Sequence, residues 1–117
     1  MCEIVVVDDS PTMLQVVSTM LRDYTVETFS TFDEAAIYLQ SHKPQMLLLD
    51  LHLKDHIAFE IFGALDRRTT EVVLMTGSSL TEAESKCRVL HKPFSKAELR
   101  LEVASALKRV EKKKRPH

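Results

Sequence analysis

The chain has 117 residues, of which 44% are hydrophobic and 28% are charged, and this length and composition fit one globular domain. No apolar run approaches the roughly 20 residues that a membrane-spanning helix needs, and the first residues lack the basic start of a secretory signal, so we expect a cytoplasmic protein. The formal net charge of −1 gives no overall field to attract nucleic acid or a membrane, and the 2 glycines are too few for a glycine-rich nucleotide loop.

Short apolar runs alternate along the chain with longer segments of helical periodicity. The runs Ile4–Val7, Met46–Leu49 and Val72–Met75 are each followed by polar residues, which is typical of buried parallel strands. Between them, apolar residues recur with the spacing of one helix face. The predicted elements in chain order are strand 3–8, helix 11–22, strand 24–29, helix 32–41, strand 45–50, helix 55–66, strand 71–76, helix 79–85, strand 87–91 and helix 95–114.

Helix-start signals support this alternation. Ser10 followed by Pro11 offers an N-cap and then a first helical residue that needs no amide hydrogen. Three further segments have the capping-box pattern, a Ser or Thr followed three residues later by Glu, and they begin at Thr31, Ser79 and Ser95. The sequence therefore predicts an α/β fold of the (βα)5 type, a parallel sheet with helices on both faces.

Polar side chains follow the predicted strands at their carboxyl ends, the edge where ligands bind in open parallel α/β sheets. The first strand ends in Asp8 and Asp9, the third in Asp50 and the fourth in Thr76, and Lys92 follows the fifth. Three carboxylates, one hydroxyl and one ammonium group are therefore expected at one edge of the sheet.

Three clustered carboxylates repel one another, and a divalent cation, Mg²⁺ or Mn²⁺, would compensate their charge. From the residues alone we expect Asp9 and Asp50 to be direct ligands and Asp8 to orient a bound water. Asp50 could then attack phosphorus and form an aspartyl phosphate, with Lys92 and Thr76 contacting phosphate oxygens. Taken singly, an aspartate at a strand end more often caps a helix than binds a ligand, and a Thr-Gly or Lys-Pro is usually an ordinary turn or loop, so only their joint placement favours a site.

As an ordered set, these segments resemble the receiver domain of two-component response regulators, and in particular the chemotaxis receivers, over roughly residues 3 to 113. The matching segments are 5–10 (VVVDDS), 47–50 (LLLD), 73–77 (VLMTG) and 92–94 (KPF). The resemblance implies a flavodoxin-like three-layer sandwich with a five-stranded parallel sheet of order 2-1-3-4-5. It also implies a cis peptide bond between Lys92 and Pro93.

The function that the resemblance implies is phosphorelay signal transduction. Asp50 would accept a phosphoryl group from a sensor histidine kinase or a histidine phosphotransfer protein, with Thr76 and Lys92 as the other catalytic residues. The domain would catalyse its own phosphotransfer and dephosphorylation rather than turn over an external substrate, and phosphorylation would switch a surface that contacts a downstream protein. The implied metal ligands are Asp8, Asp9, Asp50 and the backbone carbonyl of His52.

Three features depart from the family pattern. Segment 51–58 lacks the usual proline and the usual Asp-Gly before the third helix. Val89 occupies the position that commonly holds an aromatic switch residue, so an aromatic rotamer switch there is excluded. The stretch between Thr76 and Lys92 is short, which predicts a fourth helix reduced to about two turns.

These departures leave a second hypothesis, a phosphorylation-independent pseudo-receiver that acts as a protein-interaction module. Two enzyme classes fit less well. A phosphatase of the haloacid dehalogenase type needs Asp-x-Asp, and here His52 stands at the second position. A flavodoxin needs a phosphate-binding loop after the first strand, where Asp9 would instead place negative charge.

The last ten residues, 108–117, are strongly basic, with six Lys and Arg against a single glutamate. Positive charge at the end of a C-terminal helix is favourable against the helix dipole, so we expect a solvated helix end or the start of a linker. We accordingly expect one receiver domain over residues 1–117, a monomer or weak homodimer, with no direct contact to nucleic acid or membrane.

Overall fold

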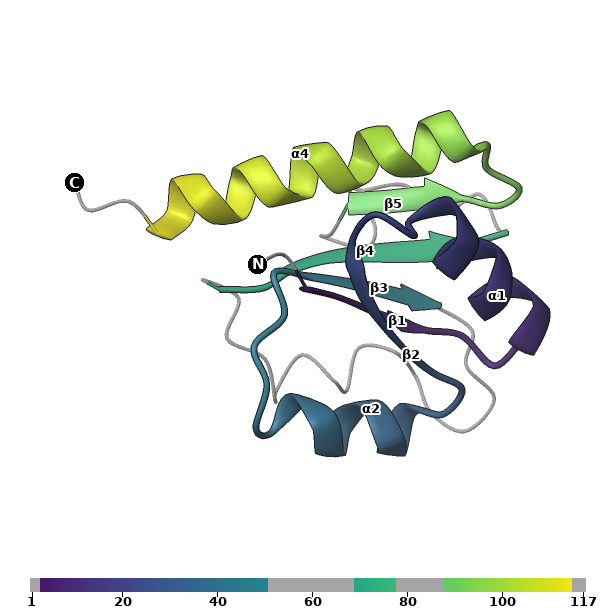
Figure 1. Cartoon of the computed structure of the whole chain (residues 1–117), viewed down its shortest axis with the longest axis horizontal. Helices are drawn as coiled ribbons and strands as arrows, with labels where there is room; N and C mark the ends of the chain where they lie inside the picture. The colour runs from purple at the N-terminus through teal and green to yellow at the C-terminus, as the bar shows by residue number, and fades with distance from the viewer. Residues whose placement is uncertain (1–2, 51–68, 78–87, 115–117) are drawn as a thin grey trace.

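The computed structural model describes residues 3–50, 69–77 and 88–114, and for Lys113 and Lys114 the backbone alone. Its centre is a parallel sheet of five strands, and the strands point the same way, so that their carboxyl ends lie at one edge (Figure 1). The order of the strands is β2-β1-β3-β4-β5, as predicted. The strands are β1 (Glu3–Val7), β2 (Thr25–Phe29), β3 (Met46–Asp50), β4 (Glu71–Thr76) and β5 (Arg88–His91).

Helices cover both faces of the sheet. Helix α2 (Phe32–Leu39) lies on one face, and α1 (Pro11–Met20) and α4 (Lys96–Lys114) lie on the other (Figure 1). The label α4 belongs to the C-terminal helix, which corresponds to the predicted helix 95–114. The two remaining predicted helices, 55–66 and the shortened 79–85, lie outside the described residues.

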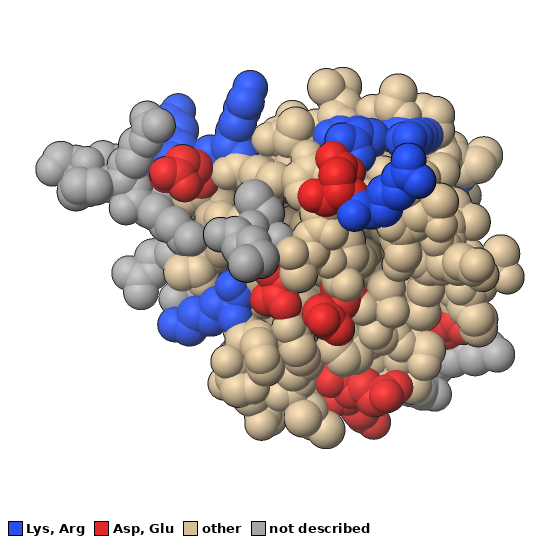
Figure 2. All heavy atoms as spheres, in the orientation of Figure 1, with Lys and Arg blue, Asp and Glu red and all other residues tan. Residues whose placement is uncertain are grey.

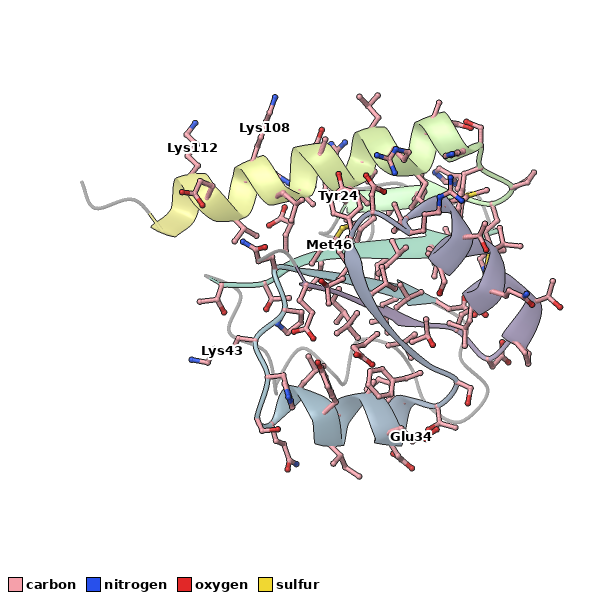
Figure 3. All side chains as sticks on the ribbon, in the orientation of Figure 1. Tyr24, Glu34, Lys43, Met46, Lys108 and Lys112 are labelled. Atoms are coloured by element: carbon pink, nitrogen blue, oxygen red, sulfur yellow. The ribbon has the colours of Figure 1, made fainter. Side chains whose placement is uncertain are left out.

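Alternation along the strands divides the core into two clusters. Odd-numbered residues of β1 and β3, such as Val5 and Leu47, pack against α2. Even-numbered residues, such as Val6, Leu48 and Met46, pack against α1 and α4 (Figure 3). Both faces of the central strands are therefore apolar, which explains why β1, β3 and β4 appear in the sequence as uninterrupted hydrophobic runs. One face of α4 also lies in the core, where Leu99, Val103, Ala106 and Val110 are fully buried and the partly buried Leu107 packs against the same cluster.

The predicted helix starts are confirmed where the structure describes them. Ser10 caps α1 by accepting a hydrogen bond from the Met13 amide at 3.2 Å, and Pro11 is the first helical residue. Ser95 and Glu98 form a reciprocal capping box at the start of α4, since each side chain accepts a hydrogen bond from the other residue's amide. At α2, Thr31 accepts from the Glu34 amide, but the Glu34 side chain accepts from the Thr31 hydroxyl instead of a backbone amide.

Two predicted helices are too long at their carboxyl ends. Helix α1 ends at Met20 rather than at residue 22, and the amide of Leu21 donates the closing hydrogen bond to the Val17 carbonyl. Helix α2 ends at Leu39 rather than at residue 41. Past α1 the apolar pattern continues with the fully buried Leu21, so periodicity alone could not show where the backbone leaves this helix. Past α2 the exposed Gln40 and Ser41 follow, and helix ends of this kind are uncertain by one or two residues.

Long-range charged contacts fix α4 against its neighbours. Arg100 donates hydrogen bonds to both carboxylate oxygens of Asp23, at 2.7 and 2.8 Å, and to the carbonyl of Met20 at the end of α1. Its guanidinium carbon also lies 5.5 Å from the centre of the Tyr24 ring. The last turns of α1 are thus held to the first turns of α4.

A second set of charged contacts joins α4 to the amino ends of β4 and β5. Arg109 forms ion pairs with Glu71 and, at 3.1 Å, with Glu102, and Glu102 also contacts Arg88 at 3.4 Å. Glu71 and Glu102 are both buried. Buried carboxylates need such partners, because an uncompensated charge in the interior is strongly destabilising.

The exposed side of α4 carries positive charge. Figure 2 shows Lys and Arg side chains gathered over this helix, and Lys108 and Lys112 point away from the sheet (Figure 3). The described part of the tail is thus a solvent-exposed helix end, as expected. In the described part of the chain, no helix is long and apolar enough to span a membrane.

Candidate functional site

The register of β1 and β3 places two of the predicted aspartates side by side. Val7 is paired with Leu49, so Asp8 and Asp50 are the next residues on neighbouring strands. The amide of Asp8 donates to the Phe29 carbonyl at 3.1 Å, which continues the pairing of β1 with β2 by one residue. Asp8 and Asp50 have the parity of the strand residues that face α1 and α4, so their side chains start from the same face of the sheet.

Lys92 directly follows β5, two strands away from β3, and its side chain extends to this pair of aspartates. The register pairs Thr76 with His91, and the Lys92 amide donates to the Thr76 carbonyl at 2.7 Å. The Lys92 Nζ lies 3.0 Å from Asp8 Oδ2 and 3.6 Å from Asp50 Oδ1. The ammonium group therefore bridges two carboxylates that come from different strands. The predicted cis peptide bond between Lys92 and Pro93 is present.

The three predicted aspartates form a cluster. One carboxylate oxygen from each of Asp8, Asp9 and Asp50 lies within 4.8 Å of the corresponding atoms of the other two. Asp8 is 1% exposed and Asp50 is 6% exposed, whereas Asp9 is half-buried. Among the residues that the structure describes, Lys92 supplies one positive charge against the three carboxylates, which leaves net negative charge that a cation would compensate. Carboxylate oxygens at this spacing match the hard oxygen ligands that Mg²⁺ prefers.

Ser10 has a second role that the sequence analysis did not identify. Its amide donates a hydrogen bond to Asp8 Oδ1 at 2.9 Å, while Lys92 occupies Asp8 Oδ2. An aspartate that accepts from the amide two residues later forms an Asx turn, and the Asp-x-Ser order of residues 8–10 is its sequence signal. Ser10 thus fixes the Asp8 carboxylate and also caps α1.

Thr76 is the last residue of β4 and is fully buried. It lies one position beyond Met75, which is paired with Asp50, so its backbone stands beside the acidic cluster. Gly77 follows it and is exposed.

The structure thus brings together Asp8, Asp9, Asp50 and Lys92, and it places Thr76 on the adjacent strand end. His52, the predicted source of a carbonyl ligand, lies outside the described residues. Val89 is buried in β5 and paired with Leu74. The site therefore depends on strand ends that the two core clusters hold in register.

Comparisons with known proteins agree with this arrangement. The family model described as "Response regulator receiver domain" matches residues 4–104. The transcriptional regulatory protein KdpE of Mycobacterium tuberculosis is 29% identical over 116 residues, which cover 91% of this chain and 51% of that protein. The chain thus spans about half the length of the curated relatives it matches.

Solved structures show the same fold. The chemotaxis protein CheY4 of Vibrio cholerae superposes with a TM-score of 0.81 and 26% sequence identity, covering 92% of this chain and 99% of that one. A structure described as the BeF3-activated DrrB receiver domain gives a TM-score of 0.78 and 29% identity, covering 92% and 98%. Because the family model covers most of the chain and the strand order is that of these relatives, the chain belongs to the response regulator receiver domain family, whose members are signalling domains.

Proposed function

We propose that this domain is a phosphorylatable switch in a phosphorelay, in which Asp50 accepts a phosphoryl group from a sensor histidine kinase or a histidine phosphotransfer protein. The observation that carries this proposal is the Lys92 ammonium group held between Asp8 and Asp50 at 3.0 and 3.6 Å. A nucleophilic carboxylate, a cation beside it and two further carboxylates provide the parts that phosphoryl transfer needs, because its catalysis is mostly positioning and charge neutralisation.

The bond changes follow from the donor's chemistry. A carboxylate oxygen of Asp50 forms a bond to phosphorus while the bond between phosphorus and the donor's imidazole nitrogen breaks, and the released histidine takes up a proton from solvent. Asp50 needs no general base, because a carboxyl group is ordinarily ionised near pH 7. In the proposal, Lys92 neutralises a phosphoryl oxygen and the Thr76 hydroxyl donates a hydrogen bond to another.

The acidic cluster fits a divalent cation, Mg²⁺ or Mn²⁺. Asp8, Asp9 and Asp50 would hold it, together with the carbonyl of His52, which lies outside the described residues. A bound cation would neutralise charge on the incoming phosphoryl group. The Ser10 amide donates a hydrogen bond to Asp8 Oδ1 at 2.9 Å, which fixes the orientation of the Asp8 carboxylate in the cluster.

The proposed output is a contact with a downstream protein, switched by phosphorylation, and the proposed organisation is a single receiver domain over residues 1–117. The rival pseudo-receiver hypothesis relied on segment 51–58 and on the short fourth helix, and both lie outside the described residues. A direct test of the chemistry therefore decides between the two hypotheses.

That test is the intact mass of the protein after incubation with acetyl phosphate and MgCl₂. We expect the wild type to gain the mass of one phosphoryl group, and we expect EDTA or the substitution Asp50→Asn to abolish the gain. Asp33→Asn is the matched control, because Asp33 is an exposed aspartate on α2 outside the acidic cluster, and it should behave like the wild type. No gain in the wild type would refute the proposal and favour the pseudo-receiver, and a gain that persists in Asp50→Asn would refute Asp50 as the acceptor.

A further inference from the structure

Helix α4 has an exposed outer face, opposite to the face that lies in the core. Its residues are spaced three or four apart and so share one side of the helix: Ala97, Leu101, Ala104, Lys108 and Lys112, all of them exposed. The first part of this outer face is apolar, and Leu101, at 71% exposed, is the most exposed large hydrophobic residue in the described part of the chain. The second part is basic, since Lys108 and Lys112 point away from the sheet (Figure 3).

The positive charge of this helix lies far from the negative charge of the acidic cluster. Residues 108–117 carry six Lys and Arg against one glutamate, a net charge of +5, so the rest of the chain carries −6 within the overall −1. Arg109 pairs with Glu71, the first residue of β4, so the basic part of α4 lies at the amino ends of the strands. The acidic cluster lies at their carboxyl ends. A negatively charged surface would therefore attract the domain through α4 and orient it.

An anionic lipid surface fits both parts of the outer face. On a helix that lies along such a surface, lysine ammonium groups stay among the lipid phosphates while an apolar side chain enters the boundary of the acyl chains. Nucleic acid fits less well. Its phosphate backbone offers an exposed leucine no apolar contact, and α4 contains no aromatic residue that could stack on bases.

We propose that the outer face of α4 docks this domain onto an anionic membrane surface, with Lys108 and Lys112 among the headgroups and Leu101 at the acyl boundary. The overall net charge of −1 gives no general attraction to a membrane, so the contact depends on the separation of charge within the domain. The inference goes beyond the proposed phosphoacceptor function and does not rest on it, because no residue of the outer face belongs to the acidic cluster.

The test is cosedimentation of the full chain with vesicles, either an equimolar mixture of phosphatidylcholine and phosphatidylglycerol or phosphatidylcholine alone. The wild type should bind the mixed vesicles, bind them more weakly as NaCl is added, and leave the neutral vesicles unbound. The double variant Lys108→Gln, Lys112→Gln should lower the partition coefficient about 30-fold, since each lysine near an anionic surface contributes about fivefold. Leu101→Ser should lower it about tenfold, because an apolar side chain no longer leaves water.

Ile37→Ser and Lys43→Gln are the matched controls. Ile37 is 66% exposed on α2, and Lys43 is exposed just after α2, so both lie across the sheet from α4 and should leave binding unchanged. Asp50→Asn should also bind like the wild type, which separates this inference from the phosphoacceptor function. Equal binding to both kinds of vesicle, wild-type binding by Leu101→Ser, or an equal loss in the matched controls would overturn the inference. Tighter binding to double-stranded DNA than to the mixed vesicles at the same salt concentration would assign the face to nucleic acid and overturn it as well.

Discussion

Lys92→Met removes the ammonium group that bridges Asp8 and Asp50 but keeps most of the apolar stem of the side chain. Carboxylate oxygens of the three aspartates lie within 4.8 Å of one another, and at an effective dielectric constant of about 20 each such pair repels by about 3 kcal/mol. The attraction between Lys92 and Asp8 over 3.0 Å amounts to about 5 kcal/mol on the same scale. Desolvation offsets part of this attraction, so we expect the free energy of unfolding to fall by about 2–3 kcal/mol in the variant.

The assay is urea unfolding followed by circular dichroism, in EDTA and again with MgCl₂. In EDTA the free energy of unfolding should fall by the full amount. In MgCl₂ the fall should be smaller, because a bound cation would supply positive charge in place of the ammonium group. Lys43→Met is the matched control, since Lys43 is exposed and points into solvent (Figure 3), and it should change stability by no more than about 0.5 kcal/mol. Equal stability of Lys92→Met and the wild type in EDTA would show that Lys92 does not compensate the acidic cluster.

Three further substitutions probe contacts away from the site. Burial and the hydrogen bond to Glu3 raise the pKa of Tyr38 well above its usual value, so the protonated side chain stabilises the fold below pH 10.0 and this stabilisation is lost as the pH rises further. Tyr38→Phe should lower the free energy of unfolding by about 1 kcal/mol near neutral pH. In thermal melts the variant should not show the loss of stability at alkaline pH that the wild type shows. The Arg100 hydrogen bonds lower the pKa of Asp23 from 3.8 to about 2, so they stabilise the fold while Asp23 is ionised. The difference in stability between the wild type and Arg100→Ala should therefore narrow as the pH falls from 3.8 toward 2. Equal urea midpoints of the two proteins at neutral pH would contradict this reasoning. Arg109→Met should lower the free energy of unfolding by about 2–3 kcal/mol, because the buried Glu71 and Glu102 each lose one ion pair while Glu102 keeps its contact with Arg88, and the response to MgCl₂ in the same urea titrations should be unchanged.

The strands and the polar residues at their carboxyl ends could be predicted because both follow from short-range patterns. Apolar runs identify the strands, and each run is followed by the polar residue that stands at the carboxyl edge. Once β1 is placed beside β3, parallel pairing brings Asp8 next to Asp50, as the pairing of Val7 with Leu49 shows. The family resemblance supplied the strand order, which periodicity alone leaves open.

The contacts that fix α4 could not be predicted in this way. Arg100 and Asp23 are 77 residues apart in the sequence, and Arg109 and Glu71 are 38 apart. A surface arginine has no local pattern that identifies its partner, because the partner depends on how two helices and a strand pack in three dimensions. The carboxyl end of α1 was predicted too late for a related reason, since Leu21 remains buried after its backbone has left the helix.

One feature of this molecule works against stability, and it lies at the carboxyl edge of the sheet. Three carboxylates stand within 4.8 Å of one another. Away from this edge the described chain has apolar strands, capped helices and paired buried carboxylates. Departures from this pattern are expected where a ligand or a reaction requires them. In the proposed function a bound cation would relieve the charge repulsion in the cluster, so this cost to stability has an explanation if this edge receives a phosphoryl group.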